Sequence, residues 1–212
     1  MNGATKLVCF DLDDTLIFDV HSVMFLCILN NRYEQLLDIE KRESAGEIDW
    51  ITADHYKAEL LAGLAVSKIQ IEFDRIIKPI KNIALVVNDL RKRNILSIVI
   101  TSGPVQVANA IKEIYGFNGS YGSEYEVVDG VFTGKILNHI GNKGKIVCLM
   151  DFCEKNNITP NECVAVGDGS TDIPLFEYCQ ESIAINYSPS VAGKATHYIK
   201  TQDLSEVLVF IT

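Results

Sequence analysis

The period of hydrophobic and polar positions changes along the chain, and each change predicts a structural element. Residues 6–10 form a short apolar run that stops at a cluster of carboxylates, which predicts a buried strand. From about residue 18 to residue 77 the apolar positions recur at helical spacing, in 23–29 and again in 56–64. Gly46 and Asp49 indicate a break between these helices.

Beyond residue 78, predicted helices and strands alternate. Helices are expected over about 82–93, 104–115 and 143–156, strands over 96–100, 163–166 and 182–185, and a last helix near Leu204. Pro104 suits a first helical turn. Asp129-Gly130, between two β-prone arms, predicts a hairpin. This alternation predicts an α/β fold: a Rossmann-like parallel sheet with helices on both faces.

The helical stretch after the first strand is too long for a simple crossover. It predicts a small helical cap inserted into the α/β core. We therefore expect a core domain of residues 1–17 and 79–212, and a cap domain of residues 18–78.

Composition narrows the class of partner. The 212 residues carry 28 acidic and 19 basic side chains, a formal charge of −9 that disfavours a nucleic-acid partner. No apolar run is long enough to span a membrane, and the N-terminus lacks the features of a secretory signal. Six scattered cysteines without a Cys-x-x-Cys pair are typical of reduced core residues. We expect a cytoplasmic protein.

Polar clusters follow three of the predicted strands, and ligands of parallel sheets bind outside the carboxyl ends of strands. Asp11 and Asp13 follow the first strand at a spacing that lets both face a ligand. Thr101-Ser102-Gly103 follows the second and offers a hydroxyl and backbone N–H groups to an anion. Taken alone, each cluster could also be explained as a helix cap.

A third cluster and a lysine complete the set. Asp168 and Asp172, in a loop with two glycines, suit a hard cation held by oxygen ligands, although a plain loop and N-cap would look the same. Lys143, at the start of a predicted helix, can supply positive charge to a phosphoryl group or a carboxylate, although a single lysine is usually solvated.

In order and spacing, these four elements resemble the motifs of the haloacid dehalogenase superfamily, in particular its phosphoserine-phosphatase-like branch with a helical cap. Asp11-Leu12-Asp13-Asp14-Thr15 matches the first motif in full. Thr101 matches the hydroxyl of the second motif, and Asp168 and Asp172 the acidic pair of the fourth. Lys143, followed by Gly144, is chosen for the third motif ahead of Lys145.

The resemblance implies a Mg²⁺-dependent phosphatase that acts on a small-molecule phosphate monoester. Asp11 would be the nucleophile that forms an aspartyl-phosphate, and Asp13 the general acid/base. Mg²⁺ would be held by the carboxylates of Asp11 and Asp168 and the carbonyl of Asp13. Asp172 would not bind the metal itself but would orient its water ligands or Lys143. Thr101, Ser102, Gly103 and Lys143 would bind the phosphoryl group. A monomer or a homodimer is expected.

The cap departs from phosphoserine phosphatases, whose cap carries a glutamate and an arginine. Asp19 and Val20 occupy the glutamate's place, and the arginine aligns near His55 or Lys57. Because bidentate arginine is the usual partner of a carboxylate, these departures argue against phosphoserine itself. The cap residues considered for contact with the leaving group are Asp19, His21, Arg32, Trp50, His55 and Lys57.

Other functions are compatible with parts of the pattern. A phosphotransferase would use the same intermediate with an acceptor alcohol in place of water. A non-catalytic phosphate-binding regulatory protein would be expected to lack at least one motif residue, yet none is missing. A nucleotide-binding redox module would need a glycine-rich loop where the carboxylates stand.

Overall fold

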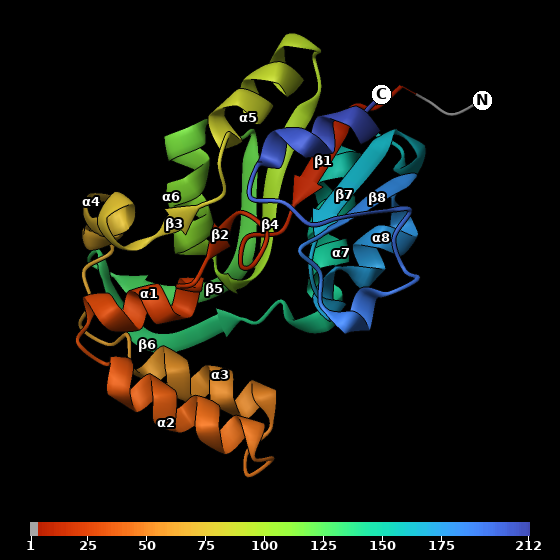
Figure 1. Cartoon of the computed structure of the whole chain (residues 1–212). Coiled ribbons are helices and arrows are strands. Elements are labelled where there is room, and N and C mark those ends of the chain that lie inside the picture. Colours follow the sequence, from red (N-terminus) through yellow and green to blue (C-terminus); the bar gives the residue numbers. More distant parts are fainter. Residues whose placement is uncertain (1–3) are drawn as a thin grey trace.

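A seven-stranded sheet forms the centre of the molecule (Figure 1), in the order β6-β5-β4-β1-β7-β8-β9. The computed structural model describes residues 4–212, apart from the side chains of Asn142 and Lys143. The strands are β1 (Leu7–Phe10), β4 (Leu96–Pro104), β5 (Gly119–Val128), β6 (Val131–Asn138), β7 (Cys163–Gly167), β8 (Glu181–Ile185) and β9 (His197–Ile199). Neighbouring strands are parallel except β5 and β6, which form an antiparallel hairpin.

Both faces of the sheet are covered, which explains why β1 is apolar without alternation. Val8 and Phe10 pack on the side of α5 (Ile83–Lys92), α6 (Val105–Tyr115) and the 3₁₀ helix η4 (Leu204–Phe210). Leu7 and Cys9 pack on the opposite side, against α7 (Gly141–Asn156) and α8 (Ile173–Tyr178). The predicted α/β fold is confirmed.

The predicted hairpin is confirmed at its turn. Asp129 and Gly130 connect β5 to β6 with positive φ angles of 51° and 77°. A two-residue turn with both central residues in this region matches the twist of the flanking strands, and glycine adopts it at little cost.

Four helices fill the segment between two short strands, β2 (Ile17–Phe18) and β3 (Lys78–Pro79), which pair with each other. They are α1 (Ser22–Leu29), α2 (Tyr33–Ser44), α3 (Trp50–Glu59) and α4 (Ser67–Ile76), and we call them the cap. The predicted break is confirmed: Asp49 caps α3 by accepting hydrogen bonds from the N–H groups of Ile51 and Thr52, each 3.0 Å long. The division into two domains stays a prediction.

Backbone contacts attach the cap to the β5–β6 hairpin. The N–H of Gly63 donates to the carbonyl of Phe132, and the N–H of Phe132 donates to the carbonyl of Leu64, each at 2.9 Å. Phe25 and Phe73 of the cap belong to the same buried cluster as Phe10 of the sheet. The cap therefore shares one hydrophobic core with the sheet.

Some elements differ from those predicted. The strands β2, β3 and β9 have two or three residues each, too short to produce a period in the sequence. The last helix is a 3₁₀ helix. Trp50, considered from the sequence for contact with the leaving group, lies beside His139 of the core, with ring centroids 5.3 Å apart. In the described part of the chain, no helix has the length and apolar character needed to cross a membrane.

Truncating Phe73 to alanine tests the shared core. Phe73 is fully buried and packs edge-on against Phe25, with centroids 6.0 Å apart. We expect Phe73→Ala to lower the free energy of unfolding by about 3–5 kcal/mol, measured by urea denaturation. Ile71→Ala on the same helix is the control, because Ile71 is 75% exposed. Equal effects of the two substitutions would contradict the packing described.

Candidate active site

The ends of three neighbouring strands bring the predicted polar clusters together. β1 lies between β4 and β7, so Asp11 follows the central strand of the three. The N–H of Asp11 donates to the carbonyl of Val166 at 2.9 Å, which continues the β1–β7 pairing by one residue. Thr101 lies within β4 and is buried, and Asp168 follows β7 directly.

A buried lysine joins two of these carboxylates. Lys145 Nζ lies 2.7 Å from Asp11 Oδ1 and 2.7 Å from Asp172 Oδ1. The three residues are only 1%, 5% and 0% exposed, respectively. Although burial disfavours the charge of Lys145, the two carboxylates outweigh that effect and raise its pKa. The lysine is therefore a fixed cation beside Asp11.

This contact involves Lys145, the lysine that the motif comparison placed second to Lys143, and the role of Lys143 stays a prediction. The lysine at Asp11 is Lys145, while the side chain of Lys143 lies outside the described residues. Lys145, Leu149 and Cys153 are four residues apart in α7 and all buried, so they share the face that packs on the sheet. The sequence carried this signal, because Lys145 is in phase with the apolar positions that follow it.

Asp172 organises the loop after β7. Its second oxygen, Oδ2, accepts hydrogen bonds from the N–H groups of Asp168 and Gly169, both 3.1 Å long. The loop has no room for a side chain at Gly167, where a Cβ would lie 2.4 Å from Asp172 Cγ. With both oxygens engaged, Asp172 positions Lys145 and the backbone that carries Asp168.

The carboxylates at this site form a group that fits a divalent cation. Asp11, Asp168 and Asp172 each offer an oxygen within 4.8 Å of the others. Burial, then Asp172, raises the pKa of Asp11 against the opposing effect of Lys145, and the same two causes raise the pKa of Asp168 to about 7. Three carboxylates around one lysine leave an excess of buried negative charge, which a hard cation with oxygen ligands would offset.

The cap holds Asp13. Asp13 Oδ1 accepts the N–H of Ser22 at 2.6 Å, and Oδ2 accepts the Ser22 hydroxyl at 2.7 Å. Burial raises the pKa of Asp13, although the bonds from Ser22 oppose the shift. Asp13 thus accepts the first N–H group of α1 and also lies at the candidate active site. Sequence reasoning missed Ser22, a serine at a helix start whose partner was not evident from spacing.

Thr101 and Gly103 lie beside Asp13. The N–H of Gly103 donates to Thr101 Oγ1 at 3.0 Å. A Cβ on Gly103 would lie 2.4 Å from Ser22 Oγ and 3.3 Å from both Thr101 Oγ1 and Asp13 Oδ2. Only glycine therefore fits where the cap, Thr101 and Asp13 meet.

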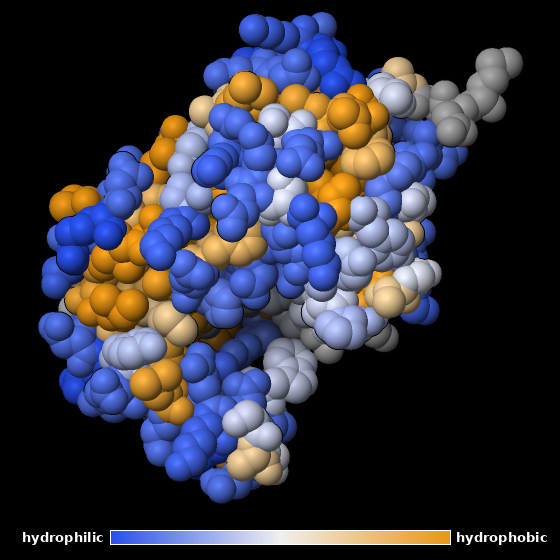
Figure 2. All heavy atoms as spheres, viewed as in Figure 1, coloured by the Kyte–Doolittle hydropathy of each residue, from blue (hydrophilic) through white to orange (hydrophobic). Residues whose placement is uncertain are grey.

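Ser102 faces a cavity between the core and the cap. The Ser102 hydroxyl is buried without a hydrogen-bond partner in the described structure. The cavity has a volume of about 200 Å³. Figure 2 shows the molecule hollowed where the α2–α3 pair meets the core. The lining residues are Asp13, His21, Ser22, Val23, Met24, Glu40, Asp54, Lys57, Ser102, Gly103 and Tyr125.

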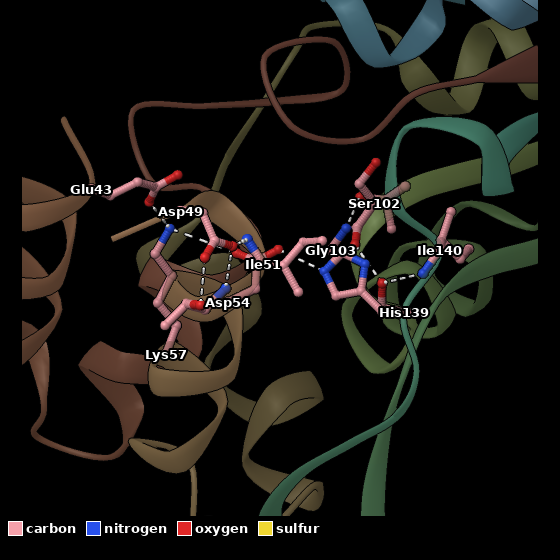
Figure 3. A network of polar contacts seen from close by, with 12 residues as sticks. Glu43, Asp49, Ile51, Asp54, Lys57, Ser102, Gly103, His139 and Ile140 are labelled. Atoms are coloured by element: carbon pink, nitrogen blue, oxygen red, sulfur yellow. Dashed lines mark hydrogen bonds and ion pairs between the residues drawn. The ribbon is translucent and has the colours of Figure 1, made fainter. Parts of the chain in front are cut away.

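Figure 3 shows the polar contacts near this cavity: Asp54 of α3 points to His139 of the core, and Lys57 points to Glu43 within the cap. Asp54 Oδ2 lies 2.8 Å from His139 Nε2, a polar contact across the gap. Of the six cap candidates named from the sequence, His21 and Lys57 line the cavity. Glu40 and Tyr125, which the sequence did not single out, line it as well.

Comparisons with known proteins agree with this geometry. A family model described as haloacid dehalogenase-like hydrolase matches residues 8–177. A phosphoserine phosphatase of Saccharomyces cerevisiae is 28% identical over 210 residues, which cover 98% of this chain and 68% of the relative. A phosphoserine phosphatase of Methanocaldococcus jannaschii is 27% identical over 214 residues, the full length of both chains.

A solved structure gives the same result. The phospho-aspartyl intermediate analogue of a phosphoserine phosphatase superposes with a TM-score of 0.82 at 26% identity, over 99% of this chain and 100% of that one. The chain therefore belongs to the haloacid dehalogenase-like hydrolase family, in its phosphoserine-phosphatase-like branch, and is a metal-dependent phosphatase of small phosphate monoesters that works through an aspartyl-phosphate.

Proposed function

We propose that Asp11 is the nucleophile, Asp13 the general acid/base and Lys145 the fixed cation of the reaction, with Mg²⁺ as the metal. The observation that carries this proposal is the buried Lys145 bound to both Asp11 and Asp172, with Asp168 close by. A lysine and three carboxylates are costly to bury for stability alone, which supports a chemical role.

Asp11 attacks phosphorus, and the bond from phosphorus to the leaving oxygen breaks as the Asp11–phosphorus bond forms. A carboxylate nucleophile divides a slow hydrolysis into two easier steps. Lys145 holds one oxygen of Asp11, which leaves the other for attack. Water then cleaves the aspartyl-phosphate and regenerates Asp11.

Asp13 donates a proton to the leaving alcohol and later accepts one from the attacking water. Its raised pKa favours the protonated form that the first step needs. One group can serve both steps because the second step reverses the proton demand of the first. Ser22 fixes the direction in which the Asp13 carboxyl points.

Thr101, Ser102 and Gly103 would bind the phosphoryl oxygens that do not react. The unpartnered hydroxyl of Ser102 supports this role, because a buried donor without a partner is costly in the absence of a ligand. Lys145 takes the part of the phosphoryl-binding cation that Lys143 was expected to play, and would offset negative charge that builds on these oxygens.

Mg²⁺ would be held by carboxylate oxygens of Asp11 and Asp168, together with the backbone carbonyl of Asp13. When bound, it would supply positive charge between the nucleophile and the phosphoryl group. Asp172 keeps Lys145 and the loop of Asp168 in place, so its role is positioning.

Hydrolysis is proposed ahead of transfer to an acceptor alcohol. The cavity of about 200 Å³ has room for a small leaving group, and a second substrate would have to enter after that group departs. A small phosphate monoester is the substrate class that fits.

Asp11→Asn should abolish turnover while the fold remains. Asparagine has the shape of aspartate but lacks its nucleophilic charge, so we expect release of phosphate from p-nitrophenyl phosphate to fall by a factor of about a thousand or more. Circular dichroism should be unchanged, and Asp38→Asn, at an exposed position of α2, serves as the control. Full activity of Asp11→Asn would refute the assignment.

Lys145→Met tests the proposed role of Lys145 as the fixed cation of the reaction. It removes the cation from two buried carboxylates, so we expect loss of activity and a decrease in unfolding free energy of about 3 kcal/mol or more. Lys155→Met on the same helix should change neither quantity appreciably, because Lys155 is exposed and pairs only with Asp151. An active Lys145→Met variant would remove this lysine from the mechanism.

Removal of divalent cations should stop the reaction, and Mg²⁺ should restore it. Because a ligand that binds only the folded state stabilises it, Mg²⁺ should also raise the melting temperature. Asp168→Asn should abolish the rise, whereas Asp151→Asn on the surface of α7 should preserve it. Phosphate release with EDTA and with Mg²⁺ measures the effect on activity, and calorimetric scans under the same two conditions measure the melting temperatures. A rise in Asp168→Asn equal to that of the wild type would contradict the proposed ligand set.

A further inference from the structure

The cavity beside Asp13 is unevenly charged, and its charges bear on which leaving group it accepts. Three of its lining residues are acidic, Asp13, Glu40 and Asp54, and two are basic, His21 and Lys57. Among the described residues, no arginine lines it. The lining residues therefore do not offer the planar two-pronged donor that binds a carboxylate most effectively.

The positive charge of Lys57 is already balanced by carboxylates of the cap. Its Nζ lies 2.7 Å from Glu43 Oε2 and 3.7 Å from Asp54 Oδ1, and its side chain is 13% exposed. A carboxylate on the leaving group would have to displace one of these partners. Because Glu43 and Asp54 sit on the cap with Lys57, the displaced charge would stay nearby and repel the newcomer.

The positive charge of His21 is balanced by a carboxylate in the same way. Its Nε2 lies 3.1 Å from Asp14 Oδ1, and the hydrogen bond to Asp14 raises the pKa of His21 to about 9. The imidazolium and the Asp14 carboxylate therefore offset each other at the rim of the cavity. Neither basic lining residue is left to attract an anionic group.

Glu40 is different. It projects from α2 into the cavity lining, and no ion pair engages it in the described part of the chain. The neighbouring Tyr125 is buried, which raises the pKa of its phenol, so it contributes an uncharged hydroxyl. The charge of Glu40 helps to raise the pKa of His21, but the two groups form no ion pair in the described structure, so Glu40 can still accept a further cation in the space beside it.

We propose that the leaving group carries an ammonium group and no carboxylate, so that the substrate is the phosphate ester of a small amino alcohol, with Glu40 as the residue that recognises the cation. This inference rests on the proposed function. The cavity of about 200 Å³ suits such a group, which has only a few heavy atoms. Glu40 acts on binding of the leaving group and takes no part in the chemical steps.

Four phosphate esters test the proposal on the wild-type protein with Mg²⁺. O-phosphoethanolamine carries the cation alone, O-phosphoserine adds a carboxylate, glycerol 3-phosphate is uncharged outside its phosphate, and p-nitrophenyl phosphate reports general activity. We expect kcat/KM for O-phosphoethanolamine to exceed the values for O-phosphoserine and glycerol 3-phosphate at least tenfold.

Three substitutions on α2 give the sharper comparison. Glu40→Gln should lower kcat/KM for O-phosphoethanolamine about tenfold, mainly through KM, and leave glycerol 3-phosphate within about twofold. Glu34→Gln, on the exposed first turn of the same helix, should change neither value. Glu43→Gln removes the nearer of the two carboxylates that pair with Lys57 and should raise kcat/KM for O-phosphoserine.

The outcomes separate the two proposals. Turnover of glycerol 3-phosphate or p-nitrophenyl phosphate without preference for O-phosphoethanolamine, or equal effects of Glu40→Gln on cationic and neutral esters, would overturn the cation proposal alone. A preference for O-phosphoserine that Glu40→Gln does not alter would do the same. Absence of turnover with all four esters would overturn the proposed function, and this inference with it.

Discussion

The site depends on one buried interaction, the contact of Lys145 with Asp11 and Asp172. An ammonium group loses several kcal/mol of hydration when it is buried, and here two carboxylates at 2.7 Å compensate it. The same contact fixes three elements relative to one another: the end of β1, the start of α7 and the loop after β7. Asp172 extends this order to the backbone of Asp168 and Gly169 through its other oxygen. The position of the nucleophile is thereby tied to that of the acidic loop.

A second contact ties the catalytic acid to the cap. Asp13 belongs to the core, yet both of its oxygens are held by Ser22, at the first turn of α1. Gly103 lies against the same serine, with no space for a side chain. The direction of the Asp13 carboxyl is therefore set by the cap, and the cap that forms the leaving-group cavity also orients the group that protonates the leaving oxygen.

Sequence patterns predicted the sheet, the helices on both faces and the convergence of Asp11, Thr101 and Asp168. These features follow from the period of hydrophobic positions and from the rule that ligands bind at strand ends. The hydrophobic period and the polar clusters after the strands can both be seen in a single sequence. The choice of Lys143 ahead of Lys145 rested on motif spacing and did not use the helical phase. Counted from Leu149 and Cys153, Lys145 falls on the buried face of α7.

Other features could not be predicted in this way. The pairing of Lys57 with Glu43 joins two helices through side chains fourteen residues apart, and no periodicity encodes it. The contact between Ser22 and Asp13 depends on how the chain turns between β1 and α1. The unmatched charge of Glu40 becomes apparent only when the other charges of the cavity have been assigned to partners.

The attachments of the cap restrict how the enzyme can admit its substrate. One side of the cap joins the core through the paired strands β2 and β3, and another is bonded to the backbone of the β5–β6 hairpin. Because β2 and β3 pair with each other, a swing of the whole cap could leave their pairing intact, but it would break the backbone bonds to the hairpin. A smaller tilt of α2 and α3 would keep those bonds. Contacts that oppose such a tilt at the mouth of the cavity include the bond between Asp54 and His139 and the packing of Trp50 beside His139. Turnover can then proceed without exposing the shared hydrophobic core to water.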